Sequence, residues 1–225
     1  MEEGSYSSGT STFPLMGMTI GEMVNSIAEK YPDTDAVVSM HQNIRWTYAE
    51  FNRRVNEVAR GLMGMGVAKG DRVGIWAMNH AEWILVQFAT SKIGAIMVNI
   101  NPAYRTYELE YALKQSEVST LFIQGRFKTS DYIGMFYEAC PEAYESKHGK
   151  IASEKFPYLK NVIFIGNTPY NGMFTWDDLI KRSVPFWMFR EEGVLGQGFM
   201  SEEITVIGVP DAERSIYKGM TEERW

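Results

Sequence analysis

A single cysteine and three histidines are the side chains of this sequence best suited to nucleophilic or metal chemistry. Cys140 could attack an electrophilic carbon only as a thiolate, which a neighbouring histidine normally generates. No motif places a histidine beside Cys140, and His41, His80 and His148 are too dispersed for the short spacings of metal sites. We expect neither a cysteine nucleophile nor a metal centre. One cysteine also excludes an intrachain disulfide, which fits a reducing compartment.

Three glycines in the segment GLMGMG, at positions 61, 64 and 66, superficially suggest a dinucleotide-binding loop. Such a loop follows a strand and opens a helix, whose N-terminal N–H groups hold the pyrophosphate. Here the glycines close a helical pattern and precede an apolar strand pattern. Helix termination is the better interpretation, so an independent nucleotide-binding Rossmann protein is disfavoured.

The segment SYSSGTSTFP, residues 5–14, has the hydroxyl-rich composition of a phosphate-binding loop. It contains one glycine and no lysine, and it precedes every predicted strand, whereas a phosphate loop follows one. We interpret it as a flexible arm. From its own pattern, therefore, no residue of the chain qualifies as catalytic, cofactor-binding or metal-ligating.

Three helix starts are predicted from capping patterns, in which a small polar residue is followed three positions later by a glutamate. These pairs are Thr19 with Glu22, Thr47 with Glu50, and Asn79 with Glu82. The second pair opens a run with apolar residues at positions 51, 55, 58 and 62, which is the spacing of one helix face. The sequence therefore predicts an amphipathic helix that ends near Gly66.

Short apolar segments alternate with helical patterns along the chain. Strands are predicted at residues 72–77, 95–100, 120–124 and 161–166, and helices at residues 79–93, 106–116 and 130–139. This alternation indicates an α/β fold with a doubly wound, mostly parallel sheet, in which the first three strands are neighbours. Residues 35–40 and 43–47 flank a polar turn and predict a hairpin at the edge of that sheet.

Composition and charge exclude several functional classes. The 225 residues are 45% hydrophobic and 22% charged, as in ordinary globular proteins. A net charge of −6 with scattered basic residues argues against a nucleic-acid partner. Gln87, Ser91 and Lys92 interrupt the most apolar stretch, which argues against a membrane span. The acidic first residues, which lack arginine, do not resemble an import signal, so composition alone favours a cytoplasmic location.

The segment from residue 47 to residue 124 and the residues just beyond it carry a characteristic set of motifs. They include GVAKGDRVGIW, NHAEWILVQFA, VNINPAYRTYELEYAL and FKTSDY. This set closely resembles the N-terminal domain of the AMP-forming acyl-CoA synthetases, a branch of the adenylate-forming enzymes. The combination of VNINPAY with FKTSDY is most similar to the medium-chain acyl-CoA ligases termed acyl-CoA synthetase family member 2, which are mitochondrial in animals. The resemblance extends over about residues 5–180.

By this resemblance, the expected activity is ATP-dependent formation of an acyl adenylate from a medium-chain fatty acid, followed by acyl transfer to CoA. ATP, Mg²⁺ and CoA serve the resembled family, and a mitochondrial location is implied by the resemblance alone. The motifs present here have scaffold roles. Gly70 and Asp71 suit a tight turn before a strand, and Asn101 with Pro102 suits a turn that ends one.

The motifs that hold ATP in the resembled family do not occur in this sequence. They are a Thr-Ser-Gly-Thr-Thr-Gly-x-Pro-Lys-Gly loop, Tyr-Gly-x-Thr-Glu and Thr-Gly-Asp motifs, and a lysine of the C-terminal lid domain. Residues 202–213 resemble the first lid strand, but the residues that follow, Lys218 included, do not match. We expect a partial N-terminal synthetase domain at residues 1–190 and a lid remnant with a divergent tail at residues 191–225.

Two hypotheses about activity follow. The first is a member or fragment of a medium-chain ligase, such as a truncated isoform, that is inactive as written and binds no cofactor of its own. The alternative is a non-catalytic interaction or acyl-binding module that pairs with a full-length synthetase. Because residues 204–209 would form a strand without a partner, we expect the tail to be mobile or loosely docked.

Overall fold

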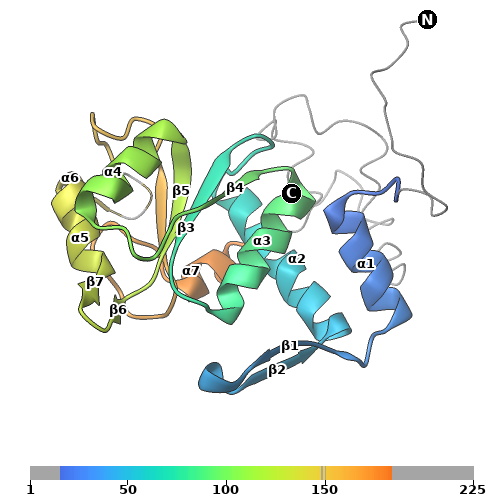
Figure 1. Ribbon diagram of the computed structural model, residues 1–225. Coiled ribbons are helices and arrows are strands. Elements are labelled where there is room, and N and C mark those ends of the chain that lie inside the picture. Colours follow the sequence, from blue (N-terminus) through green and yellow to red (C-terminus); the bar gives the residue numbers. More distant parts are fainter. Residues whose placement is uncertain (1–15, 148, 150, 184–225) are drawn as a thin grey trace, which may run out of the picture.

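The computed structural model describes residues 16–147, 149 and 151–183 (Figure 1). The arm at residues 5–14, the predicted boundary after residue 190 and the predicted strand at residues 204–209 lie outside the described residues. The elements are α1 (Ile20–Lys30), β1 (Asp35–Ser39), η1 (Met40–Gln42), β2 (Ile44–Thr47), α2 (Tyr48–Gly64), β3 (Arg72–Trp76), α3 (Ala81–Ile93), β4 (Ile96–Asn99), α4 (Thr106–Gln115), β5 (Val118–Ile123), β6 (Arg126–Phe127), β7 (Ser130–Asp131), α5 (Tyr132–Ala139), α6 (Glu142–Glu145), β8 (Asn161–Phe164) and α7 (Trp176–Lys181).

A four-stranded parallel sheet in the order β4-β3-β5-β8 forms the centre of the molecule. All four predicted strands are present, and the three predicted to be neighbours are neighbours. β5 is the best-buried strand, since each of its six residues is buried. A strand covered on both faces shows no alternation of apolar and polar residues. The two polar residues of VSTLFI, Ser119 and Thr120, are buried and hydrogen-bonded to the neighbouring strands.

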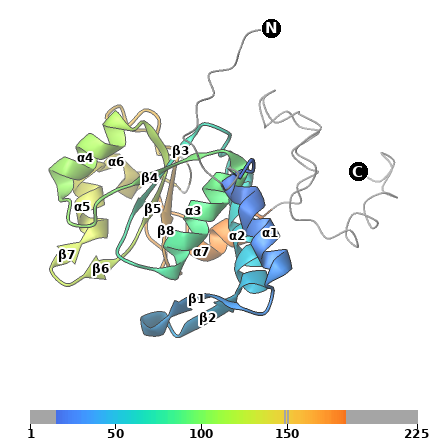
Figure 2. The same ribbon diagram turned by 45° about the vertical axis from the view of Figure 1, so that its right-hand side comes forward.

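Helices cover both faces of the sheet, as the doubly wound prediction requires (Figures 1 and 2). α1, α2, α3 and α7 lie on one side, and α4, α5 and α6 lie on the other. Two hydrophobic clusters correspond to these sides: Phe122 of β5 belongs to the first, whereas Leu121 and Ile123 belong to the second. The alternation along β5 thus joins the two halves of the core.

The predicted hairpin forms, but its predicted place at the edge of the main sheet is wrong. β1 and β2 pair antiparallel as a separate two-stranded sheet, joined through η1 and Asn43 in a left-handed conformation. Val37 and Trp46 are buried in the cluster that contains α2. The Arg54 guanidinium of α2 lies 4.6 Å from the centroid of the Trp46 ring. The hairpin therefore buries its apolar face against a helix and forms a two-stranded sheet of its own.

Two of the three predicted helix starts are confirmed. Thr19 and Glu22 form a complete capping box at α1, and the Thr47 hydroxyl accepts a hydrogen bond from the backbone N–H of Glu50 at α2. The third is wrong, because α3 begins at Ala81 after His80 and not after Asn79. α3 ends at Gly94 with φ of 69°, as its glycine indicates.

The segment at residues 130–139 also differs from the prediction at its start. Ser130 and Asp131 pair with β6 as a short antiparallel ribbon, and α5 starts only at Tyr132. The Asp131 carboxylate caps this helix by accepting a hydrogen bond from the N–H of Gly134 at 3.0 Å. The helix predicted at residues 106–116 is present as α4, which spans Thr106–Gln115 and has Ser116 as its C-cap. No helix among the described residues is long and apolar enough to cross a membrane.

Lys92 of α3 ties three helices together through neutral partners. Its Nζ donates hydrogen bonds to Asn25 Oδ1 of α1 at 2.5 Å, and to the Oδ1 atoms of Asn52 and Asn56 of α2 at 2.6 and 2.7 Å. Its stem lies against Gly21, where a β-carbon would be 3.1 Å from Lys92 Cγ. Burial lowers the pKa of Lys92 from 10.5 to about 8.

This lowered pKa predicts that stability rises with pH between about 8 and 10.5. In that window the unfolded chain holds a proton on Lys92 that the folded chain has released, so raising the pH favours the folded state; below the window both states hold it. Because the side chain is only partly buried, we expect a gain of about 1–2 kcal/mol. Urea unfolding at several pH values measures it. Lys92→Met should remove the rise of the free energy of unfolding between pH 8 and 10.5. Lys160→Met, which changes an exposed lysine, should leave this rise unchanged. The same pH dependence in both variants would contradict the assignment to Lys92.

Candidate functional site

The order of the strands reverses between β3 and β5, because the chain runs from β3 outward to β4 and then returns to the other side of β3. In open α/β sheets, ligands bind outside the carboxyl ends of the strands at such a switch point. Three loops meet here, at residues 77–80, 100–105 and 124–125. They define the candidate site, which we call the carboxyl edge.

Gln124, the residue after β5, is the central polar side chain of the carboxyl edge. It is 3% exposed. Its Oε1 accepts a hydrogen bond from the backbone N–H of Met78 at 2.8 Å and lies 3.0 Å from His80 Nε2, which donates when the proton is on that nitrogen. Gln124 Nε2 is buried and has no hydrogen-bond partner. Gln124 therefore fixes the loop after β3.

The start of α3 is held by a residue of the hairpin tip. Gln42 Oε1 accepts a hydrogen bond from the N–H of Ala81 at 2.8 Å, and Gln42 Nε2 donates to Glu82 Oε2 at 2.8 Å. This explains why the predicted cap at Asn79 is not used, since a side chain from a distant segment supplies the acceptor. The tip also brings His41 to 6.3 Å from His80, measured between ring centroids.

The turn after β4 is fixed by two aromatic side chains. Trp76 Nε1 donates to the carbonyl of Asn101 at 3.1 Å, and the Tyr132 hydroxyl donates to the carbonyl of Pro102 at 2.8 Å. The two rings pack edge to face at 4.6 Å between centroids. Asn101 Oδ1 accepts from the N–H of Ala103, which confirms the predicted turn. Burial raises the pKa of Tyr132, so its hydroxyl stays a donor at neutral pH.

Cationic side chains surround this edge. Arg105 Nη1 donates to Ser130 Oγ at 3.1 Å, and Arg126 pairs with Asp131 at 3.0 Å. Lys128 lies in the loop between β6 and β7. The N–H of Gly134 and the Arg126 guanidinium hold the pKa of Asp131 below its usual value. The carboxyl edge thus combines hydrogen-bond donors with charged groups, of which Arg126 is paired with Asp131, and such a set suits a polar ligand.

The residues that the sequence offered as candidates for a nucleophile, a metal site or a phosphate loop have mostly structural roles. Cys140 is fully buried, and burial raises the pKa of its thiol, which disfavours a reactive thiolate. Within the described residues, no group of three or more His, Cys, Asp or Glu side chains could hold a metal ion. Gly61 and Gly64 end α2 where it packs on α7, and Gly66 follows with φ of 82°. The glycine run therefore terminates a helix, as predicted.

Gln124 is expected to be important for stability as well as position. Gln124→Ala would leave the N–H of Met78 and the His80 ring without their shared acceptor, at a cost of about 2 kcal/mol. Chemical unfolding measures the difference. Gln115→Ala, on the exposed end of α4, is the matched control and should change the free energy of unfolding by less than about 0.5 kcal/mol. A similar small change at both positions would show that the Gln124 contacts are unimportant.

Comparison with known proteins places this domain in a family. The family model described as "AMP-binding enzyme" matches residues 24–173, which extend from α1 to the residues just before α7. The chain belongs to the AMP-binding enzyme family. This confirms the resemblance that the motifs between residues 47 and 124 indicate.

The relatives within this family are acyl-CoA synthetases. The chain is 46% identical over 164 residues to a protein of Bacillus subtilis named putative acyl-CoA synthetase YngI, covering 73% of this chain and 30% of that protein. It is 36% identical over 176 residues to mouse "Medium-chain acyl-CoA ligase ACSF2, mitochondrial", covering 78% of this chain and 28% of the relative. The chain thus spans less than a third of the length of these relatives.

Solved structures confirm the adenylate-forming fold. The anthranilate CoA ligase AuaEII, in complex with anthranoyl-AMP, matches with a TM-score of 0.60 at 22% identity, over 73% of this chain and 28% of that one. A luciferase-like enzyme from the mealworm Zophobas morio matches with a TM-score of 0.59 at 18% identity, over 79% and 36%. At these identities the comparison with solved structures supports the fold and nothing about the activity.

Sequence reasoning missed the polar cluster of the carboxyl edge. Gln42, His80 and Gln124 belong to no common motif and come from three separate segments. The available signal was indirect: Gln124 is a polar residue directly after a predicted buried strand, at the carboxyl end where ligands bind in such sheets.

Proposed function

We propose that the chain serves ATP-dependent acyl-CoA formation as the N-terminal domain of a fatty acid:CoA ligase, with medium-chain acids as substrates. The observation that carries this proposal is the family match, which falls on the parallel-sheet domain and on its carboxyl edge. The names of the relatives support the reaction class, and the ACSF2 proteins support the chain length. The names of the ACSF2 proteins alone support a mitochondrial location.

In this proposal, the chain's own residues build a rigid wall of the substrate site. Gln124 fixes the loop after β3, and Trp76 with Tyr132 fixes the turn after β4. These contacts hold three loops at one end of the sheet before any ligand arrives. Preorganised donors of this kind position a substrate without a further ordering cost.

In this reaction, ATP supplies the adenylyl group and CoA supplies the thiol that accepts the acyl chain. Among the described residues, the glycine run is used in helix packing, and no group of three or more His, Cys, Asp or Glu side chains is placed to hold a metal ion. The sequence also lacks the ATP-binding motifs of the resembled family. We propose that the 225 residues do not form acyl adenylate alone. In the full-length relatives, the segments that this chain does not match would supply this chemistry.

A chimera tests whether this domain can function as the N-terminal domain of an active ligase. Residues 24–173 replace the aligned segment of the Bacillus subtilis relative, and ATP- and CoA-dependent consumption of C4 to C16 fatty acids is measured. We expect activity within about tenfold of the parent, with a preference for medium chains. A chimera that folds with the circular dichroism and melting behaviour of the parent but forms no acyl-CoA would contradict the proposal. Activity without preference for medium chains would contradict only the substrate assignment.

A further inference from the structure

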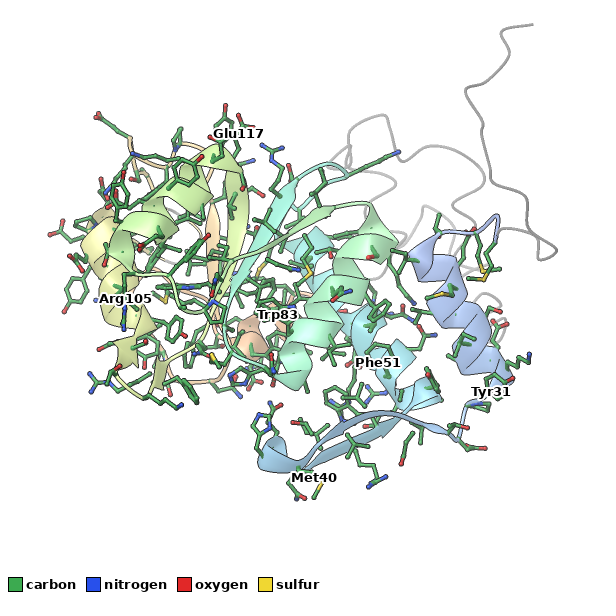
Figure 3. All side chains as sticks on the ribbon, viewed as in Figure 1. Tyr31, Met40, Phe51, Trp83, Arg105 and Glu117 are labelled. Carbon is green, nitrogen blue, oxygen red and sulfur yellow. The ribbon has the colours of Figure 1, made fainter. Side chains whose placement is uncertain are left out.

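A pocket of about 210 Å³ opens at the amino edge of the sheet, at the opposite end of β5 from Gln124. It lies between the last turn of α4, the first residue of β5 and the segment before β8. Its lining residues are Leu113, Lys114, Val118, Phe156, Pro157, Tyr158 and Leu159. Figure 3 labels Arg105 and Glu117, which lie at the two ends of α4 and mark the carboxyl edge and the pocket end respectively.

The interior of the pocket is apolar and preformed. Leu113, Val118, Phe156 and Leu159 are each at most 3% exposed, and all four belong to one hydrophobic cluster of the core. Side chains packed this closely keep one conformation, so the cavity does not have to be opened by a ligand. Tyr158 is 49% exposed.

A cation without a carboxylate partner lies beside the apolar interior. Lys114 Nζ is 6.0 Å from the centroid of the Phe156 ring, and Lys114 forms no ion pair within the described part of the chain. The two acidic residues nearest in sequence are otherwise engaged. Glu110 pairs with Lys155, and Glu117 pairs with Arg72 at 2.5 Å. An anionic head group would therefore find Lys114 available.

We propose that this pocket binds the tail of a straight-chain carboxylate, with the carboxylate on Lys114. At about 30 Å³ for a group the size of a water molecule, the cavity has room for about seven such groups. This corresponds to the tail of a medium-chain acid. The site is separate from the carboxyl edge and does not depend on catalysis by the chain.

Two quantitative expectations for binding affinity follow from the volume and the charge of the pocket. Affinity should rise about fourfold with each methylene that enters the apolar cavity, from butanoate to about octanoate. It should then level off, because further methylenes would remain in water. Replacing the carboxylate by an alcohol of equal length should weaken binding about tenfold, through loss of the charge-assisted contact with Lys114.

The test is a titration of the ¹⁵N-labelled 225-residue chain with butanoate, hexanoate, octanoate and decanoate, followed by amide NMR shifts. We expect the largest shifts at Leu113, Lys114, Val118 and Leu159. Lys114→Glu should weaken octanoate binding at least tenfold. Lys160→Glu makes the same charge change at an exposed residue outside the pocket, and it should have less than a twofold effect. Both positions are exposed, so both variants should fold.

Several results would overturn the proposal. Absence of shifts in the pocket up to millimolar octanoate would do so, as would shifts confined to the carboxyl edge. Equal weakening by Lys114→Glu and Lys160→Glu would show general charge attraction instead of a site. An affinity that keeps rising through decanoate without levelling would show adsorption on apolar surface.

Discussion

Replacing Phe122 by alanine should lower the free energy of unfolding by about 3–5 kcal/mol, the range found for fully buried phenylalanines. Phe122 lies near the carboxyl end of β5, is fully buried, and packs against Trp176 of α7 at 6.0 Å between ring centroids. The substitution would leave a cavity between the sheet and the helices of one layer. Urea unfolding followed by far-UV circular dichroism measures the loss.

Phe127→Ala is the matched control for this prediction, because Phe127 is 40% exposed in the short β6 strand. We expect it to change stability by less than about 1 kcal/mol. Domains of this size have total stabilities of about 5–15 kcal/mol, so the Phe122 variant should approach unfolding while the Phe127 variant does not. Similar midpoints for both variants would contradict the placement of β5 at the centre of the fold.

Gly61→Ala should destabilise the protein by about 3 kcal/mol, although alanine is the better helix former. In an exposed helix interior the same change would stabilise by about 1 kcal/mol. Here a β-carbon on Gly61 would overlap the carbonyl oxygen of Leu179 and lie 2.9 Å from Leu179 Cδ1. The backbone of α7 must move away, at the upper end of the usual cost of overpacking.

The sign of this effect tests whether α2 packs closely on α7 at Gly61. Thermal unfolding of Gly61→Ala and of Gly17→Ala provides the comparison, since a β-carbon on Gly17 meets nothing within 4 Å. We expect a clear loss for the first variant and almost no change for the second. A stabilised Gly61→Ala protein would show that α2 and α7 do not pack closely at this glycine.

The strands and helices of the main domain could be predicted because their signals are local. The strand VSTLFI is buried along its whole length because helices cover both of its faces, and Gly94 ends α3 because its φ of 69° suits glycine. The position of the hairpin could not be predicted in this way. Its buried residues, Val37 and Trp46, are explained by contact with α2, and the alternation within the hairpin does not say which surface it meets.

The candidate site was less predictable than the fold. Sequence motifs indicated the turn at Asn101 and the family, but the Gln124 and His80 side chains are 44 residues apart and meet only because β3 and β5 are neighbours. Likewise, Gln42 caps α3 from 39 residues away, which is why the local pattern at Asn79 predicted the wrong cap. Polar contacts between distant segments depend on topology and leave no regular spacing in the sequence.

The most direct test of the proposed function is an assay of the purified 225-residue chain beside the full-length Bacillus subtilis relative. Each protein receives ATP, Mg²⁺, CoA and octanoate, and AMP and octanoyl-CoA are quantified. The proposed function predicts equal amounts of both products from the relative and none above the buffer level from this chain. Octanoyl-CoA and AMP formed in equal amounts by this chain alone would contradict it, because ATP would then be bound and used by residues to which we assign no such role.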